Sequence, residues 1–285
     1  VLRLLGSGKL SLNLTTLGFP EDKLSTFKKW INQPYGMVVI SGPTGSGKST
    51  TLYAALKEIH SEGINITTVE DPVEYQLKGI NQVQIHDEIG LSFAASLRSI
   101  LRQDPDVLLI GEIRDEETAN IAVKFSMTGH LVFCTVHAND ATSTILRLLD
   151  LGIPPFLLGS SLNLVMAQRL VRIIDDENKE AYKPTKNDLD LVSFPKTKIK
   201  STKFYRGIPH RTNHNSGYKG RTAIHEILEV DNPMKKLIFD GANQNEIKKA
   251  AIKNGMTPLR EAGIQKVISG FTTIDEVLRA TVEDI

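Results

Sequence analysis

The sequence has little of the features that mark secreted, membrane-spanning or polyanion-binding proteins. Its only cysteine, Cys134, has no partner for a disulfide within the chain, so a reducing, cytoplasmic compartment fits best. No stretch approaches about 18 consecutive apolar residues and the start has no signal-peptide pattern, which argues against a transmembrane helix and against secretion. With 34 Lys and Arg against 33 Asp and Glu, the net charge is +1, so charge gives no strong case for a nucleic acid or an anionic membrane as partner.

An initiator methionine is also lacking, because the chain opens at Val1. We therefore expect a fragment of a longer protein that begins at the end of a strand. At 285 residues the chain can nevertheless bury a full α/β core and a smaller appended unit.

The most informative motif that is present is a glycine-rich stretch of nine residues, Gly42-Pro43-Thr44-Gly45-Ser46-Gly47-Lys48-Ser49-Thr50. It matches the phosphate-binding pattern G-x-x-x-x-G-K-[ST], and it lies between a strand-like apolar run and a helical pattern. A loop in this context points its backbone N–H groups, and the helix N-terminus, at the phosphates of a nucleotide. Lys48 would neutralise phosphate charge and the Ser49 hydroxyl would ligate Mg²⁺. The pattern predicts a nucleotide-binding protein that uses ATP and Mg²⁺.

Around this motif, strand-like and helical patterns alternate along the chain. Alternation of this kind indicates a mostly parallel sheet with helices on both faces, and the nearly continuous apolar character of the strands agrees with that arrangement. The predicted strands are residues 37–41, 66–69, 106–110 and 131–136, and the predicted helices are 48–59, 93–102, 116–127, 142–149 and 155–170.

The regions on either side of this core have a different character. Residues 1–36 predict a short strand, a turn and a helix around 21–30. Residues 172–221 are rich in Lys, Asn, Thr and Pro and predict an irregular excursion with room for one hairpin, poorly ordered over 176–203. Order returns with a strand at 223–230 and helices to the end of the chain, the last of them N-capped by Thr273.

Two acidic positions follow predicted strands, where ligands bind in open α/β sheets. Glu70 and Asp71 follow one strand, and Glu112 follows the apolar run that ends at Ile110. The second run is similar to a Walker B strand, although Gly111 stands where an aspartate usually ends it. Glu112 would then hold the water shell of the metal, orient the attacking water, or do both, and Glu70 is the competing general base. Capping of a turn before Pro72 is the alternative role for the first pair.

Two histidines, His130 and His137, bracket the predicted strand 131–136. Being seven residues apart, they lie at opposite ends of that strand and cannot share one metal site. His137 stands at the carboxyl end, where phosphates would bind, so it is the better candidate for a γ-phosphate sensor. A purely structural role is the alternative for each.

The phosphate loop and four further motifs, in this order, resemble the secretion ATPase superfamily, and in particular the type II secretion and type IV pilus-assembly ATPases. The resemblance runs from about residue 1 to the end of the chain, and residues 217–222 and 270–278 favour the assembly branch over the retraction branch. Besides the phosphate loop, the motifs are Thr68-Val69-Glu70-Asp71-Pro72-Val73-Glu74-Tyr75, residues 97–106, Gly111-Glu112-Ile113-Arg114-Asp115, and Thr128-Gly129-His130 with His137-Ala138-Asn139-Asp140.

The resemblance implies a RecA-like P-loop NTPase domain with a mostly parallel sheet, followed by a small irregular and helical C-terminal region. Its implied division is 1–36 for the end of a truncated N-terminal domain and linker, 37–171 for the ATPase core, 172–221 for the excursion and 222–285 for the C-terminal strand and helices.

The resemblance also implies roles for single residues and an assembly. Glu70 would belong to an Asp box, Glu112 to an atypical Walker B motif that holds Mg²⁺ through water, and His130 and His137 to a His box. Arg98, Arg102 and Arg3 match basic family positions near the nucleotide, and surface charge is the alternative for each. The expected assembly is a homo-hexamer in the cytoplasm, peripheral to the inner membrane, which binds inner-membrane platform proteins and no nucleic acid.

The sequence departs from the family at one place. Assembly ATPases commonly carry two C-x-x-C pairs around the excursion, which would form a tetrahedral zinc site. The matching positions here are Asp175 with Asn178 and His210 with Asn213, and this set of ligands binds zinc weakly. We therefore expect no zinc site.

The function expected from these features is that of an ATP-hydrolysing motor subunit that powers assembly of a type II secretion pseudopilus or a type IV pilus. Two alternatives stay open: a nucleotide-gated scaffold or regulator with little turnover, and a DNA-uptake or DNA-translocation ATPase of the same superfamily. The modest net charge counts mildly against a DNA track.

Overall fold

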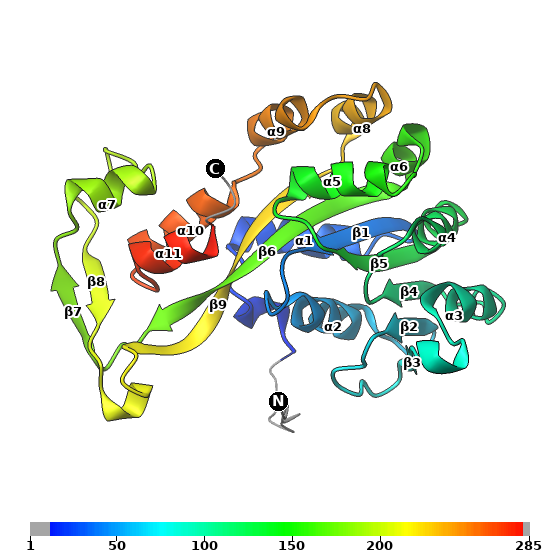
Figure 1. Ribbon diagram of the computed structural model, residues 1–285, viewed down its shortest axis with the longest axis horizontal. Helices are drawn as coiled ribbons and strands as arrows, with labels where there is room; N and C mark the ends of the chain where they lie inside the picture. Colours follow the sequence, from blue (N-terminus) through cyan, green and yellow to red (C-terminus); the bar gives the residue numbers. More distant parts are fainter. Residues whose placement is uncertain (1–11, 282–285) are drawn as a thin grey trace.

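A seven-stranded sheet organises residues 12–281, the part of the chain that the computed structural model describes (Figure 1). The strand order is β3-β2-β4-β5-β1-β6-β9; the first six strands in this order pair parallel, and β9 pairs antiparallel with β6. The mostly parallel sheet expected from the sequence is therefore confirmed. The strands are β1 (Gly36–Ser41), β2 (Ile66–Glu70), β3 (Asn81–Gln84), β4 (Val107–Ile110), β5 (Leu131–Val136), β6 (Leu162–Ile174) and β9 (Tyr218–Glu229).

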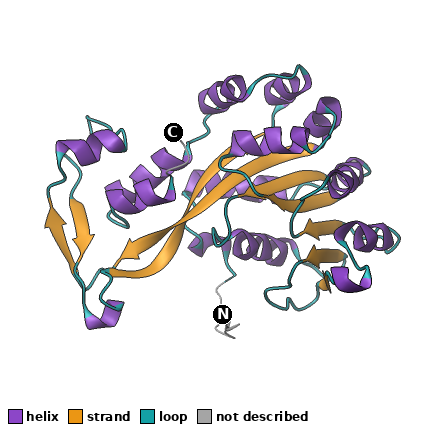
Figure 2. Ribbon diagram, in the orientation of Figure 1, coloured by secondary structure: helices purple, strands orange, loops and turns teal. Residues whose placement is uncertain are grey.

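Helices cover both faces of the sheet because its central strands are apolar on both sides (Figure 2). Along β1, Met37 and Val39 join the core on one face, and Val38 and Ile40 join the core on the other, as the two-residue period of a strand requires. The first face is covered by α3 (Phe93–Ile100), α4 (Glu116–Met127), α5 (Ala141–Asp150), α6 (Pro155–Ser161), α8 (Asn232–Phe239) and α9 (Gln244–Lys253), and the second by α1 (Glu21–Ile31) and α2 (Lys48–Ile59).

The helix predicted over residues 155–170 is wrong for most of its length. Helix α6 ends at Ser161, and the chain continues as the 13-residue strand β6 between β1 and β9. The first eight residues of β6 are all buried, so they show no alternation of apolar and polar side chains. A run buried on every side has no periodicity that separates a helix from a central strand. This correction changes which side chains reach the functional site.

The expectation of a poorly ordered stretch at 176–203 also differs from the structure. Strands β6 and β9 leave the core as a long ribbon that carries an outer unit, visible at the left of Figure 1. We call residues 175–217 the arm; it contains β7 (Lys179–Tyr182), α7 (Lys186–Leu191), β8 (Phe204–Gly207) and the 3-10 turn Arg211–Asn213. The predicted hairpin is matched by the antiparallel pair β7–β8, but its two strands are joined by residues 183–203, which contain α7, and not by a short turn.

The arm has an apolar core of its own, shared with the two C-terminal helices. Val192, Phe194 and Phe204 are buried against residues of α10 (Leu259–Ile268) and α11 (Ile274–Ala280). The sequence of the arm has little periodicity and did not predict this core. Its few apolar residues are far apart in the sequence and meet only in the folded chain. The proposed boundary at 171 falls inside β6, and the one at 221 falls inside β9. The division of the chain into units stays a prediction.

Other local expectations are confirmed. Helix α1 begins at Glu21, and the Thr273 side chain accepts a hydrogen bond from the backbone N–H of Glu276 at the start of α11. No helix within residues 12–281 is long and apolar enough to cross a bilayer.

Candidate functional site

A cleft of about 540 Å³ opens at the carboxyl ends of β1, β2, β4 and β5. This is the edge at which open α/β sheets bind ligands, because the loops that follow parallel strands all emerge there. The cleft is lined by residues of the phosphate loop, of the ends of β2 and β5 and the segments after β2, β4 and β5, of the start of α3, and of β6 and β9: Thr44, Gly45, Ser46, Gly47, Lys48, Ser49, Thr50, Glu70, Asp71, Pro72, Glu74, Tyr75, Phe93, Gly111, Glu112, Arg114, Thr135, His137, Leu170 and Arg221.

The phosphate loop has the backbone that an anion site requires. It connects β1 to α2, with φ +79° at Gly45 and +88° at Gly47, values in the left-handed region that L side chains rarely adopt. Helix α2 begins at Lys48, so the positive end of the helix faces the loop. This confirms the predicted strand, loop and helix at this position.

Lys48 lies across the loop with its charge inside the cleft. Its Nζ donates to the carbonyl oxygens of Gly42 at 2.6 Å and Pro43 at 3.1 Å. Burial lowers the pKa of the Lys48 ammonium, the nearby Glu112 carboxylate raises it, and Arg169 lowers it. The two hydrogen bonds to neutral carbonyl groups hold the ammonium beside the loop.

Glu112 and His137, predicted from separate motifs, form a pair in the cleft. Nε2 of His137 lies 3.1 Å from one carboxylate oxygen of Glu112, and Nε of Arg114 donates to the other at 2.8 Å. The Glu112 side chain is 17% exposed, so it still reaches the cleft. A carboxylate held between an imidazole and a guanidinium is well suited to orient a water molecule.

Glu70, the last residue of β2, is held more tightly. Its carboxylate accepts hydrogen bonds from the Tyr53 hydroxyl, from Oγ1 of Thr68 at 2.7 Å and from Nε2 of Gln82 at 3.2 Å. Burial raises the pKa of Tyr53, and the hydrogen bond to Glu70 raises it further. Because three donors occupy its oxygens, Glu70 has less freedom than Glu112 to take a proton from water.

Two other predicted residues are not brought to this cleft, and a third cannot be placed. His130, at the opposite end of β5, stacks on Phe125 with ring centroids 3.9 Å apart. Arg98 on α3 is exposed and pairs with Glu117 of α4 at 2.7 Å, away from the phosphate loop. Arg3 lies outside the described residues.

Several residues at the site were not assigned a role from the sequence. Arg114 follows Glu112 by two positions, so its place beyond the end of β4 was a usable signal. Arg221, Gln168 and Arg169 come from β9 and β6, which only the fold brings to the loop. The Arg169 guanidinium, 6% exposed, donates to the carbonyl of Asn139 at 2.7 Å in the segment that follows His137.

The oxygen atoms that line the cleft suit a hard cation that binds to few protein ligands. Within residues 12–281 no cluster of three or more His, Cys, Asp or Glu could hold a metal by itself. The Ser49 hydroxyl and the Glu112 carboxylate do line the cleft next to the loop. Mg²⁺ commonly binds through one or two protein oxygens, with phosphates and water completing its octahedron, so these residues fit that ion.

The four positions that match the family's cysteine pairs are joined by hydrogen bonds in the arm. Oδ2 of Asp175 accepts from Nδ2 of Asn178 at 2.8 Å and from Nδ2 of Asn213 at 2.9 Å. Asn213 also donates to the carbonyl of Ile208 and accepts from the backbone N–H groups of His210 and Gly217. We call Asp175, Asn178 and Asn213 the Asp175 cluster. The absence of zinc itself stays a prediction.

The strand, glycine-rich loop and helix, with a lysine in the loop and acidic residues at neighbouring strand ends, define a phosphate-loop nucleotide-binding protein with a RecA-like fold. The model of the family described as "Type II/IV secretion system protein" matches residues 1–279, and the chain belongs to that family.

Named relatives agree with this membership. The chain is 49% identical over 285 residues to the type IV pilus assembly ATPase PilB of Myxococcus xanthus, and 46% identical over 285 residues to the type II secretion system ATPase E of Vibrio cholerae. These alignments cover 100% and 99% of this chain but only 50% and 56% of the relatives, so the chain spans about half their length.

A solved structure of the pilus retraction motor PilT with bound ADP superposes with a TM-score of 0.69 at 26% identity, over 94% of this chain and 66% of that one.

Proposed function

We propose that this protein is an ATP-hydrolysing motor subunit that powers assembly of a type II secretion pseudopilus or a type IV pilus. The observation that carries the proposal is the cleft at the phosphate loop, which Lys48 and the Glu112–His137 pair line together. The names of the relatives at 42% to 49% identity, all assembly or secretion proteins, support the assembly branch over the retraction branch.

In this proposal the residues of the chain divide the work of phosphoryl transfer. The loop N–H groups and Lys48 bind the β- and γ-phosphates, and Glu112 orients the attacking water. His137 holds Glu112 and senses the γ-phosphate, while Arg114 and Arg221 line the same cleft with positive charge. Glu70, held by its three donors, shapes the site electrostatically.

The Ser49 hydroxyl and, through water, the Glu112 carboxylate would hold Mg²⁺. When bound, the ion supplies charge neutralisation for the phosphates. The four carboxylates that line the cleft, those of Glu70, Asp71, Glu74 and Glu112, would repel a nucleotide without it.

The proposal also includes a homo-hexamer at the cytoplasmic face of the inner membrane, docked on a platform protein. Arg98 bears on this point, because it is exposed on α3, pairs with Glu117 and does not line the cleft of its own chain. In the proposed ring, Arg98 would act on the nucleotide of a neighbouring subunit. An arginine supplied in this way is worth on the order of 10³-fold or more in turnover.

The test is steady-state ATP hydrolysis by the full-length protein, with and without the membrane platform protein recovered from a pull-down. A motor hydrolyses ATP, and its rate changes when the platform protein is added. ADP binding without turnover would instead identify a nucleotide-gated scaffold, and stimulation by DNA would identify a translocase.

A further inference from the structure

One buried side chain outside the recognised motifs contacts both the phosphate loop and the helix that follows it. Gln168, on β6, is 1% exposed. Its Nε2 donates to the carbonyl oxygen of Ser46 at 2.8 Å, and its Oε1 accepts from Oγ1 of Thr51 at 2.8 Å. Ser46 belongs to the loop and Thr51 to the first turn of α2, so a single amide joins the two.

The chemistry of its partners fixes the orientation of this amide. A carbonyl oxygen can only accept, so the NH₂ group must face Ser46, and the amide oxygen then receives the Thr51 hydroxyl. The loop backbone lies directly against Gln168: a Cβ at Gly47 would be 2.8 Å from its side-chain Nε2, and one at Gly42 would be 2.5 Å from its backbone carbonyl oxygen.

The bond to Ser46 sets the direction of a peptide N–H in the cleft. In a trans peptide the C=O of one residue and the N–H of the next point in opposite directions, and the Ser46–Gly47 bond is trans. Because Gln168 draws the Ser46 carbonyl toward β6, the N–H of Gly47 is turned away from β6. Loops of this kind bind phosphate through such N–H groups.

We propose that Gln168 is a positioning residue for nucleotide binding, which aims the Gly47 N–H at the phosphates by holding the Ser46 carbonyl. The proposal rests on the proposed function, since it assumes that the loop binds a nucleotide. It assigns a role in phosphate affinity to strand β6, which carries none of the motifs of the site.

The test compares two substitutions on the same strand that each replace an amide by an apolar side chain of similar size. Gln168→Met removes both hydrogen bonds. Asn163→Leu is the matched control, because the Asn163 amide donates to the carbonyl of Tyr35 at 2.8 Å, at the opposite end of β6 from the loop. The measurements are the Kd for ADP of the full-length protein, by calorimetry, and the melting temperature without nucleotide.

We expect Gln168→Met to weaken ADP binding about tenfold, the usual effect of losing one well-placed buried hydrogen bond. Asn163→Leu should lower the melting temperature and leave the Kd within about twofold. A Kd for Gln168→Met within twofold of the unaltered protein would overturn the inference, whatever happens to its melting temperature. If the unaltered protein bound no ADP, the proposed function would fail instead.

Two further variants separate the two halves of the bridge and cover the case in which Gln168→Met does not fold. Gln168→Glu keeps an acceptor for Thr51 but sets an oxygen against the Ser46 carbonyl, so it should weaken ADP binding at least as much as Gln168→Met. Thr51→Val keeps the bond to Ser46 and should cost less than about threefold. If Thr51→Val weakened ADP binding as much as the Gln168 variants, the inference would be overturned. The contact of Gln168 with α2, and not its bond to the Ser46 carbonyl, would then determine the affinity for ADP.

Discussion

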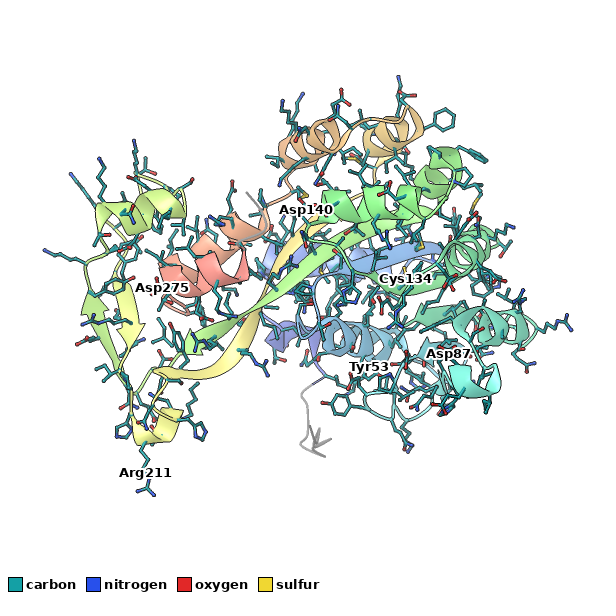
Figure 3. The ribbon with its side chains drawn as sticks, in the orientation of Figure 1. Tyr53, Asp87, Cys134, Asp140, Arg211 and Asp275 are labelled. Carbon is teal, nitrogen blue, oxygen red and sulfur yellow. The ribbon has the colours of Figure 1, made fainter. Side chains whose placement is uncertain are left out.

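The cleft and the arm use polar residues in opposite ways. Around the cleft, strands buried in apolar cores hold the structure, and the polar side chains stand at the strand ends, where they face a ligand. In the arm the apolar core is small, and Asp175 and Asn213, each 1% exposed, hold the turns together by hydrogen bonds. Figure 3 shows Arg211 in the arm at the lower left, and Tyr53 and Asp87 on the opposite side of the molecule.

The same residue type therefore has different consequences in the two regions. A polar residue at the cleft should be changeable with loss of activity and little loss of stability. A polar residue in the Asp175 cluster is part of the fold, so changing it should cost stability and leave nucleotide binding intact. The following predictions test this division.

The largest effect is expected for Lys48→Ala, which should abolish ATP hydrolysis and leave the melting temperature nearly unchanged. The ammonium is held only by loop carbonyls in the free protein, whereas in the transition state it faces phosphoryl charge worth about 3 kcal/mol or more. Steady-state hydrolysis and thermal denaturation measure the two quantities. Lys57→Ala, on the exposed face of the same helix, is the control, and turnover above about a tenth of the unaltered rate in Lys48→Ala would contradict the assignment.

The next effect distinguishes the two candidate bases. Glu112→Gln removes the charge at constant size and should lower kcat about 10²-fold or more, with ADP affinity preserved. Glu70→Gln should lower kcat less, because Glu70 is already engaged by Tyr53, Thr68 and Gln82. Measurements of kcat and Mg²⁺ titrations for both variants, with exposed Glu62→Gln as control, decide between them. A near-normal kcat in Glu112→Gln would refute the choice of Glu112.

A smaller effect, on stability alone, is expected in the arm. Asn213→Ala removes hydrogen bonds from Asp175, Ile208, His210 and Gly217 and should destabilise the arm by about 1–3 kcal/mol. Limited proteolysis should then cleave the arm first, while the Kd for ADP stays unchanged. Asp175→Ala should act in the same direction, and Asp176→Ala, next to it but 82% exposed, should not.

Metal removal provides the complementary measurement on the arm. Because hydrogen bonds occupy the positions of the family's cysteine pairs, chelator should leave the melting temperature unchanged, and metal analysis should find no stoichiometric zinc. One zinc per chain that survives dialysis and requires His210 would contradict this expectation.

The smallest effect is a pH dependence where the ribbon meets α11. Burial alone would raise the pKa of Glu276, but hydrogen bonds from Arg279 and Arg172 outweigh it and lower the pKa to about 2. Since the pKa is lower in the folded state, the stabilisation is present above the unfolded value near 4.3 and is lost as the pH falls toward 2.

Thermal denaturation from pH 6 to pH 2 measures this contribution. The loss of stability on acidification should be smaller in Glu276→Gln than in the unaltered protein, by an amount on the order of 1 kcal/mol after allowance for solvent around the two arginines. Asp275→Asn, exposed on the preceding position of α11, should follow the unaltered curve. If stability fell equally on acidification in both variants, Glu276 would not contribute to the pH dependence.

The sequence by itself determined the parts whose physical cause is local. The phosphate loop requires positive φ at Gly45 and Gly47, which glycine adopts readily, and it leads into a helix that begins at Lys48. These three residues therefore identified the phosphate site from the sequence. Apolar runs likewise located β1, β4 and β5, and the position of Glu112 after β4 and of His137 after β5 placed both at the ligand edge.

Only the tertiary structure decided the features that depend on residues far apart in the chain. Residues 162–170 are apolar enough for either a helix or a strand, and pairing with β1 and β9 made them a strand that delivers Gln168 to the loop. No periodic pattern marks Val192, Phe194 and Phe204 in the sequence. They are buried because α10 and α11 pack against them in the folded chain. Hydrogen bonding between Asp175 and Asn213 spans 38 positions of sequence, and such a contact exists only when folding has brought the two turns together.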